Sequence, residues 1–258
     1  MATQKVLITA GASGIGRAIA LAFAARGAQV AVIDVDAEGL EKLRAHHPDI
    51  HTVCCDVADR AALEIDIPSS IEVLGGLDVL VNNAGISGPT GPVEALDPLE
   101  WDKVMHINLT GTFDVTRLAI AALKRSPGPS IINMSSVAGR FGYPDRAAYS
   151  TSKWGLIGFT KSLSRELGGF GIRVNAILPG AVAGERFENV LKGRANVSGN
   201  TVEQERTQAM SIQSLQWLVD PKDIAELAVF LASDAGKSIS GQLLPIDNDM
   251  QTTSLGDL

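Results

Sequence analysis

The chain has 258 residues, of which 45% are hydrophobic and 20% charged, and its formal net charge is −7. These values suit a soluble globular α/β protein of one large domain. The acidic charge without a basic block argues against nucleic acid as a partner. No apolar segment approaches the roughly 20 residues that span a bilayer, and the start has no signal-peptide pattern. The two cysteines, Cys54 and Cys55, are adjacent and rarely bridge in that arrangement, so we expect a reducing, cytoplasmic setting.

The first 26 residues follow a strand–turn–helix pattern. The apolar run Lys5–Thr9 predicts a strand, and an amphipathic helix is predicted over 17–26. Between them, Gly11, Gly14 and Gly16 allow the backbone to turn tightly and to approach a pyrophosphate closely. The exposed amides at the start of the helix would then bind phosphate groups. This pattern favours a dinucleotide site, although a glycine-rich turn alone is weak support.

Asp34 ends the next predicted strand, Gln29–Ile33. It follows Gly16 by 18 residues, close to the roughly 20 expected for the acidic residue that binds the adenosine ribose. A carboxylate there accepts hydrogen bonds from the ribose hydroxyls and repels a 2′-phosphate. We therefore expect NAD rather than NADP as the cofactor, unless Asp34 merely ends the strand in a turn.

Strands and helices alternate along the rest of the chain, without repeats or linkers. This alternation predicts a single domain built on a doubly wound parallel sheet of about seven strands, with helices on both faces. Pro68 is expected to interrupt its helix, and the long polar segment 184–216 is expected to form a substrate-binding lid. The further strands are predicted at 50–54, 78–81, 130–134, 172–178 and 242–246, and the further helices over 37–45, 61–74, 98–124, 147–167 and 220–233.

Tyr149 and Lys153 are four residues apart in a run that predicts a helix. This spacing places both side chains on one helix face, one turn apart. A free phenol keeps its proton at neutral pH, but a nearby positive charge stabilises the phenolate. The pair therefore favours a tyrosine that exchanges a proton with a substrate, although the same spacing alone also fits an ordinary surface helix.

Small and polar residues follow several of the predicted strands. Asp56 is placed to meet an adenine edge, Asn82–Gly85 follows the strand at 78–81, and Ser135 and Ser136 follow the strand at 130–134. Because ligands bind at the carboxyl ends of the strands in such sheets, these residues are candidates for one site. Asn108 lies inside the predicted helix 98–124, where an asparagine is usually either solvated or packed against something specific.

Together the motifs resemble the short-chain dehydrogenase/reductase family over essentially the whole chain. The resemblance implies a Rossmann fold, a nicotinamide cofactor and hydride transfer at an alcohol or ketone. The residues that carry it, in the family's order and at similar spacing, are Thr9–Gly16, Asp56–Val57, Asn82–Gly85, Asn108, Ser136, Tyr149, Lys153 and Pro179–Gly180.

The resemblance also implies individual roles. Tyr149 is expected to move the hydroxyl proton, and Lys153 to stabilise the phenolate and bind the nicotinamide ribose. Ser136 is expected to orient the substrate oxygen, whereas its neighbour Ser135 is expected to be structural. Asn108 resembles the residue that kinks the helix and holds a water next to Lys153. These four catalytic candidates fit alcohol oxidation, which needs proton removal and a fixed oxygen.

Three positions depart from the family pattern. Ala10 stands where the family usually has glycine, and Gly184 stands where the family often has threonine. Near the end of the chain, Asp247–Asp249 replaces the Asp-Gly-Gly run of the family. Without the threonine, contacts to the cofactor ring are expected from Val182 and the backbone. The resemblance places the cofactor contacts at Gly11, Ser13, Gly14, Ile15, Gly16, Asp34, Asp56, Val57, Asn83, Ala84, Gly85, Tyr149, Lys153, Pro179, Gly180 and Val182.

We expect an NAD-dependent oxidoreductase that interconverts a secondary alcohol and a ketone, with a small polar polyol or hydroxy acid as substrate. The alternative within the family is a 3-oxoacyl thioester reductase, against which Asp34 argues because reductive biosynthesis usually draws on NADPH. A non-catalytic NAD-binding regulator is a more remote alternative, because such a protein has no reason to keep all four catalytic candidates.

Three smaller expectations concern the lid, metals and assembly. The lid carries the charged residues Glu185, Arg186, Lys192 and Arg194; most are expected to be solvated, but one cation there could bind a carboxylate or a polyol. The four histidines lack metal-ligand spacing, so no metal is expected. The predicted helix 147–167 also carries the apolar residues Trp154, Ile157 and Phe159, which favours self-association. The family resemblance implies that the assembly is a homotetramer.

Overall fold

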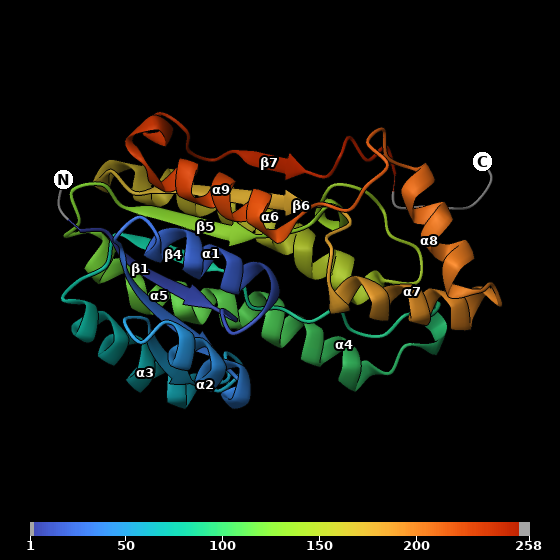
Figure 1. The fold of residues 1–258 in the computed structure, drawn as a ribbon, viewed down its shortest axis with the longest axis horizontal. Coiled ribbons are helices and arrows are strands. Elements are labelled where there is room, and N and C mark those ends of the chain that lie inside the picture. Colours follow the sequence, from blue (N-terminus) through green and yellow to red (C-terminus); the bar gives the residue numbers. More distant parts are fainter. Residues whose placement is uncertain (1–2, 253–258) are drawn as a thin grey trace.

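A computed structural model describes residues 3–252 and shows one seven-stranded, entirely parallel sheet (Figure 1). The strand order is β3-β2-β1-β4-β5-β6-β7. The chain therefore builds outward from β1 in one direction and then, from β4 onward, in the other. The strands are β1 (Lys5–Thr9), β2 (Gln29–Asp34), β3 (His51–Cys54), β4 (Val79–Asn82), β5 (Ser130–Met134), β6 (Arg173–Pro179) and β7 (Leu243–Ile246).

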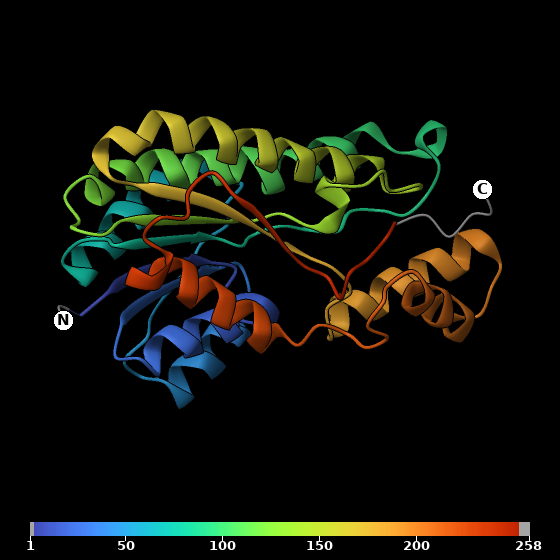
Figure 2. The same ribbon diagram turned by 90° about the horizontal axis from the view of Figure 1, so that it is seen from above.

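Helices cover both faces of the sheet (Figure 2). On β1, Val6 and Ile8 pack into the cluster with α1, α2 and α9, whereas Leu7 packs into the cluster with α3, α5 and α6. This alternation follows from the two-residue period of a strand. The helices are α1 (Gly14–Ala24), α2 (Ala37–His46), α3 (Arg60–Leu74), α4 (Pro98–Met105), α5 (Gly111–Leu123), α6 (Ala147–Leu167), α7 (Glu185–Ser198), α8 (Val202–Ser211) and α9 (Pro221–Ala232), with short 3-10 turns at Val93–Ala95, Val137–Gly139, Gly168–Phe170 and Asp234–Gly236.

The expected interruption at Pro68 is wrong, because α3 continues through it. Leu63, Ile67 and Ile71 are buried on one side of the helix, and Pro68 itself is exposed on the other. A proline removes one helical hydrogen bond and crowds the preceding turn. On the exposed side the freed carbonyl can meet water, and the buried apolar side keeps the helix in place.

The predicted helix 98–124 is divided into two. A π-helical turn, His106–Thr110, separates α4 from α5, and Asn108 lies at its centre. Such turns are rare and occur often at functional sites. The apolar pattern continues on both sides of this turn and does not indicate it, whereas the family resemblance implied a helix irregularity at Asn108.

The segment predicted as a lid forms two helices, α7 and α8, which extend beyond the sheet on the side toward which the strands point (Figures 1 and 2). Thr201 and Gln204 form a reciprocal capping box at the start of α8. At the base of this segment, Val182 and Val219 form a parallel bridge. The two ends of the lid are therefore held side by side.

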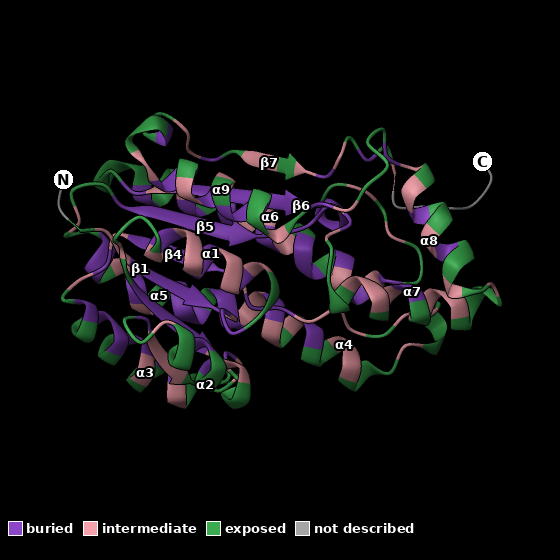
Figure 3. Cartoon of the chain, viewed as in Figure 1, coloured by how far each residue is buried: buried purple, intermediate pink, exposed green. Residues whose placement is uncertain are grey.

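Burial is greatest along the central strands, whereas most residues of the lid helices are exposed or half-buried (Figure 3). The strands β1, β4 and β5 are almost completely buried, as expected for a parallel sheet covered on both faces. Within residues 3–252, no helix is both long and apolar enough to cross a membrane.

Candidate active site

The predicted site residues meet at the carboxyl edge of the sheet. The strand order reverses between β1 and β4, and parallel sheets of this kind bind their ligands at that point. The glycine-rich turn follows β1, Asp34 ends β2, Asn83 follows β4, and Ser136 follows β5. Residues that are distant in the sequence thus come to one edge because each strand ends there.

The glycine-rich turn has almost no room for side chains on its inner side. A Cβ atom on Gly16 would lie 2.1 Å from the carbonyl oxygen of Ala10, and one on Gly11 would lie 2.7 Å from a methyl group of Val32. Gly14 has a φ of +52°, and no atom lies within 4 Å of the position of its Cβ. The turn therefore presents bare backbone outward, as a pyrophosphate site requires.

Ala10, where the family pattern has glycine, adopts the left-handed conformation with a φ of +52°. A non-glycine residue pays about 1–2 kcal/mol for this conformation. The amide of Asn83 stabilises the turn, because its Nδ2 donates hydrogen bonds to the carbonyl oxygens of Ala10 at 2.9 Å and Thr9 at 3.2 Å. Asn83 therefore supports the turn with its side chain, which points toward β1.

The first turn of α1 keeps its amide groups available. Ser13 stands at its N-cap position, but no side chain in the described part of the chain caps the helix, and its first turn has no acidic residue. By contrast, Asp36 and Asp59 cap the neighbouring helices α2 and α3. An uncapped start of α1, in contrast to the capped starts of α2 and α3, fits the binding of phosphate groups.

Asp34 lies beside this turn. One carboxylate oxygen accepts a hydrogen bond from the amide of Ala12 at 2.9 Å, and the other accepts from the amide of Asp36 at 3.0 Å. Each oxygen retains a lone pair, so a ribose diol can still donate to the carboxylate. Asp56, which follows β3, is exposed and accepts a hydrogen bond from Ala58, whereas Val57 is buried against Gly111.

Lys153 is buried on α6, with a relative exposure of 2%. Its Nζ lies 5.7 Å from the centre of the Tyr149 ring and donates a hydrogen bond to the carbonyl oxygen of Met134 at 2.8 Å. Burial, together with the positive charge of Arg186, lowers the pKa of Lys153 to about 7. The charge of this ammonium group therefore responds to whatever binds next to it.

The hydroxyl groups of the two catalytic candidates Tyr149 and Ser136 donate no hydrogen bond to the described residues. The hydroxyl of Tyr149 forms no hydrogen bond within residues 3–252. The hydroxyl oxygen of Ser136 accepts a hydrogen bond from the amide of Ala138 at 3.1 Å, which leaves its proton for another acceptor. Ser135, in contrast, donates to the carbonyl oxygen of Lys153 at 2.9 Å and thereby joins β5 to α6.

Asn108 connects the π-helical turn to this group of residues. Its Oδ1 accepts a hydrogen bond from the amide of Ile86 at 2.7 Å, and its Nδ2 donates to the carbonyl oxygen of Ile86 and to Ser152, both at 3.0 Å. Ser152 precedes Lys153 on α6. Asn108 therefore fixes the chain after Gly85 against the helix that carries Lys153.

The start of the lid explains one departure from the family pattern. Gly184 has a φ of +138° and a ψ of 176°, a conformation that is essentially restricted to glycine. A threonine at this position would be strained, so this backbone cannot offer a threonine hydroxyl there. Upstream, the amide of Gly180 donates to the carbonyl oxygen of Ile246, which fixes Pro179 and Gly180 against β7.

The third departure from the family pattern, at Asp247–Asp249, also lies where the backbone adopts a conformation that favours glycine. Asn248 and Asp249, which replace two glycines of the family pattern, both adopt left-handed conformations, with φ values of +58° and +56°. Asparagine and aspartate tolerate this region better than other non-glycine residues. The side chain of Asp249 accepts a hydrogen bond from Ser214 at 2.6 Å, which joins the tail to the segment after α8.

Two groups of residues near the site escaped the sequence analysis. Tyr143 and Arg146 lie beside Tyr149, and only an arginine three residues before the catalytic candidate could have drawn attention to them. The second group is a buried chain of hydrogen bonds between β4, β5, α5 and α6. Its members are Asn82, Thr116, Asn133 and Thr160.

The residues present fit a dinucleotide. The bare turn, the uncapped start of α1 and the carboxylate of Asp34 match a pyrophosphate and a ribose in their chemistry. Within residues 3–252, no three His, Cys, Asp or Glu side chains lie close enough together to hold a metal ion.

Comparison with known proteins gives the same picture. A family model described as enoyl-(acyl carrier protein) reductase matches residues 9–250. Levodione reductase of Leifsonia aquatica is 34% identical over 95% of this chain and 92% of its own length. The 3-oxoacyl-[acyl-carrier-protein] reductase FabG of Thermotoga maritima is 35% identical over 95% of this chain and 96% of its own length. D-threitol dehydrogenase of Mycolicibacterium smegmatis is 37% identical over 95% of this chain and 91% of its own length.

The fold is similar to that of solved dehydrogenases. The crystal structure of NAD⁺-bound xylitol dehydrogenase superposes with a TM-score of 0.91 at 30% identity, covering 94% of this chain and 97% of the other. The matched family model and these relatives cover nearly the whole chain. The protein belongs to the short-chain dehydrogenase/reductase family of oxidoreductases.

Proposed function

We propose that this protein interconverts a secondary alcohol and a ketone with NAD(H) as the cofactor. The observation that carries the proposal is the buried Lys153, whose ammonium nitrogen lies 5.7 Å from the ring of Tyr149 at the edge of the sheet where Asp34 ends β2. NAD, when bound, supplies the hydride acceptor for alcohol oxidation. The protein must then hold the alcohol and remove its proton.

Tyr149 is proposed as the proton acceptor and Ser136 as the group that fixes the alcohol oxygen. The free hydroxyl of Tyr149 can accept the alcohol proton as a phenolate, while the unused proton of Ser136 can be donated to the same oxygen. Lys153 carries its charge on the same helix face and stabilises the phenolate. Asn108 holds this face in position through Ser152.

We propose that NAD, and not NADP, is the cofactor because of Asp34. Its two oxygens are oriented by the amides of Ala12 and Asp36, so the carboxylate is fixed beside the phosphate-binding turn. A 2′-phosphate would meet this negative charge at short range. The NAD⁺-bound xylitol dehydrogenase structure supports the same cofactor. Contacts to the cofactor are proposed at the glycine-rich turn, Asn83–Gly85, Pro179–Gly180 and Val182, with Val182 contacting the nicotinamide ring.

A small polar compound is the proposed substrate, either a polyol or a hydroxy acid. The names of D-threitol dehydrogenase and xylitol dehydrogenase support a polyol. The similarity to a 3-oxoacyl-[acyl-carrier-protein] reductase keeps a 3-oxoacyl thioester as the second candidate, and the carboxylate of Asp34 argues against it. A regulator without catalytic activity would not require free hydroxyl groups on both Tyr149 and Ser136.

A screen with purified protein tests the proposal. NAD⁺ and NADP⁺ are each combined with a panel of polyols, hydroxy acids and simple secondary alcohols, and NADH and NADPH with 3-oxoacyl thioesters, while absorbance at the reduced nicotinamide band is followed. Turnover with NAD⁺ and one class of small polar alcohols supports the proposal. Turnover confined to thioesters with NADPH supports the second candidate, and no turnover while NADH binds supports a regulator.

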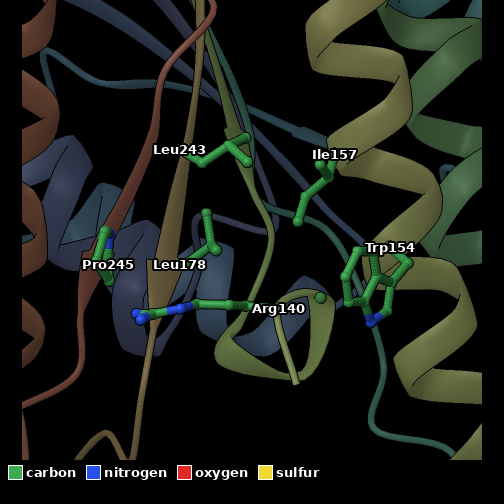
Figure 4. Close-up of a pocket in the computed structure, with 7 residues that line it drawn as sticks. Arg140, Trp154, Ile157, Leu178, Leu243 and Pro245 are labelled. Atoms are coloured by element: carbon green, nitrogen blue, oxygen red, sulfur yellow. The ribbon is translucent and has the colours of Figure 1, made fainter. Parts of the chain in front are cut away.

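We also propose that the protein is a cytoplasmic homotetramer. Trp154 on α6 and Phe113 on α5 are 50% and 46% exposed, and they supply apolar surface that a subunit interface would cover. Beside Trp154, an apolar cavity of about 370 Å³ lies between α6 and the last two strands, with side chains pointing into it (Figure 4). Its lining residues are Gly139, Arg140, Trp154, Ile157, Leu178, Leu243 and Pro245. Both cysteines are free thiols, which suits a reducing compartment.

A further inference from the structure

Three arginine side chains lie near the site, and two of them, Arg146 and Arg194, pack against tyrosine rings. Arg146 precedes α6, and Arg186 and Arg194 lie on α7. Within residues 3–252 none of the three forms an ion pair with a carboxylate, whereas Arg206 on α8 pairs with Glu188 at 2.5 Å. In a chain whose net charge is −7, this is a local concentration of unpaired positive charge.

Each guanidinium group is hydrogen-bonded to a neutral oxygen. Arg146 donates to the carbonyl oxygen of Ser87 at 2.8 Å, and Arg194 donates to the hydroxyl of Tyr143 at 2.7 Å. Arg186 donates to the carbonyl oxygen of Gly85. These bonds satisfy some N–H groups but neutralise no charge, so all three cations remain able to bind an anion.

Arg146 is the most unusual of the three. It is 3% exposed, and its Nε has no hydrogen-bond partner among the described residues. Burial lowers its pKa, and the charges of Arg194 and Arg186 act in the same direction. A buried cation without a counter-ion costs several kcal/mol. Such an arrangement is understandable if an anion supplied from outside completes it.

The cations and rings alternate in space. The guanidinium carbon of Arg146 lies 5.5 Å from the centre of the Tyr143 ring and 5.2 Å from that of Tyr149. The guanidinium carbon of Arg194 lies 5.2 Å from the centre of the Tyr143 ring. The positive charge therefore extends from α7 to the proposed proton acceptor, where the substrate is expected. The phosphates of the cofactor are expected elsewhere, at the start of α1.

Resting on the proposed function, we propose that the substrate is a hydroxy acid whose carboxylate binds Arg146 and Arg194 while its hydroxyl group faces Tyr149. A guanidinium group donates two parallel hydrogen bonds to a carboxylate, and this geometry fixes the orientation of a small substrate. Arg186, the exposed member of the group, adds positive charge next to Gly85. The site thus selects a hydroxy acid over the polyol with the same carbon skeleton.

The kinetic test compares matched substrates and matched variants. Hydroxy acids of three to six carbons are each paired with the polyol in which a hydroxymethyl group replaces the carboxylate, for example threonate with threitol. Arg194→Gln is expected to lower kcat/KM for the acid roughly 10- to 100-fold, mainly through KM, and to lower kcat/KM for the polyol much less. Arg194→Lys should restore part of the loss, because it restores the charge.

Lys192→Gln is the control variant. Lys192 is exposed on the same helix, two residues before Arg194, so the substitution removes one positive charge of α7 outside the group. It is expected to leave both substrates nearly unchanged. An equal loss of kcat/KM for the acid in both variants would overturn the proposal, because it would show that the overall positive charge of α7, and not Arg194 itself, attracts the acid. The proposal would also be overturned if Arg194→Gln raised the KM for NAD⁺ and not the KM for the acid, because Arg194 would then bind the pyrophosphate.

A binding measurement separates this proposal from the proposed function. Calorimetric titration of the wild-type protein with malonate should show binding that Arg194→Gln weakens at least roughly tenfold and that Lys192→Gln retains. Absence of malonate binding, or tighter binding of inorganic phosphate, would overturn the carboxylate site. Malonate binding without oxidation of any alcohol would uphold the site and reject the proposed function. Polyol oxidation without malonate binding would support the proposed function and reject the carboxylate site.

Discussion

The ammonium nitrogen of Lys153 lies 5.7 Å from the centre of the Tyr149 ring, one turn further along α6. The i to i+4 spacing produces this arrangement because both side chains project from one face of the helix. The surroundings make it chemically useful, since Lys153 is buried and the Tyr149 hydroxyl has no hydrogen-bond partner within residues 3–252. Each partner can therefore be tested by itself.

Replacement of Tyr149 with phenylalanine should remove turnover and preserve binding. The hydroxyl forms no hydrogen bond in the described residues, so its loss should leave the fold unchanged. General acid–base catalysis contributes about 10²–10⁴-fold, so kcat is expected to fall by about that factor. Steady-state kinetics measures the loss, and NADH fluorescence titration verifies binding. Unchanged turnover would reject Tyr149 as the proton acceptor.

The depressed pKa of Lys153 predicts a pH dependence of stability without cofactor. The folded protein releases this proton near pH 7, whereas the unfolded chain keeps it up to about 10.5. The unfolded state therefore binds more protons between these values, and the contribution of Lys153 to stability rises with pH across that window, by at most about 1.4 kcal/mol per pH unit.

Urea unfolding of the wild type and of Lys153→Met at several pH values between 7 and 9 measures this contribution. The difference in the free energy of unfolding, wild type minus variant, should increase with pH. Comparison of the two proteins cancels the other titrating groups. A constant difference would show that Lys153 has an ordinary pKa in the folded state.

Asp34→Asn should weaken the preference for NAD⁺ over NADP⁺. The asparagine side chain has the same size and keeps one acceptor oxygen, but it lacks the negative charge of the carboxylate that the amides of Ala12 and Asp36 hold in place. Hydrogen bonds to charged groups contribute about 1.5–3 kcal/mol, so the ratio of kcat/KM for the two cofactors should fall about 10- to 100-fold. An unchanged ratio would place the discrimination elsewhere.

Two glycine-to-alanine variants should shift stability in opposite directions. Gly184 has a φ of +138°, so an alanine there is strained by about 1–3 kcal/mol. Gly158 lies in α6 with no atom within 4 Å of the Cβ position, so an alanine should stabilise the helix by up to about 1 kcal/mol. Thermal unfolding of both variants measures the difference. Equal shifts would contradict the conformation assigned to Gly184.

The apolar side chains on α5 and α6 predict self-association. Gel filtration with light scattering should give about four times the chain mass of 27.1 kDa. Trp154→Glu should shift the protein to smaller assemblies, because a carboxylate would be buried in the interface. A wild-type mass equal to that of the single chain would reject the tetramer.

The sequence predicted the sheet correctly because each strand obeys a local rule. The apolar runs Lys5–Thr9 and Ser130–Met134 have the same bounds in the structure, since continuous burial on both faces requires continuous hydrophobicity. The site candidates meet at one edge because parallel strands share a direction. Their catalytic roles remain predictions.

Other features depend on tertiary contacts that no local pattern records. The π-helical turn around Asn108 is stabilised by hydrogen bonds to Ile86 and Ser152, which are distant in the sequence. Pro68 is tolerated because the buried face of α3 outweighs one lost hydrogen bond. The burial of Arg146 arises from its stacking between two rings and could not be inferred from its neighbours in the chain.

The bridge between Val182 and Val219 joins the two ends of the segment that contains α7 and α8, so this segment forms an insert on the sheet. Everything from Gly184 to Ser211 leaves and re-enters the body at one narrow neck, while the nucleotide-binding strands are complete without it. If this segment is the proposed substrate lid, we expect its exchange between related enzymes to alter substrate selectivity and to leave the sheet intact. New selectivity can arise here by replacement of one cassette.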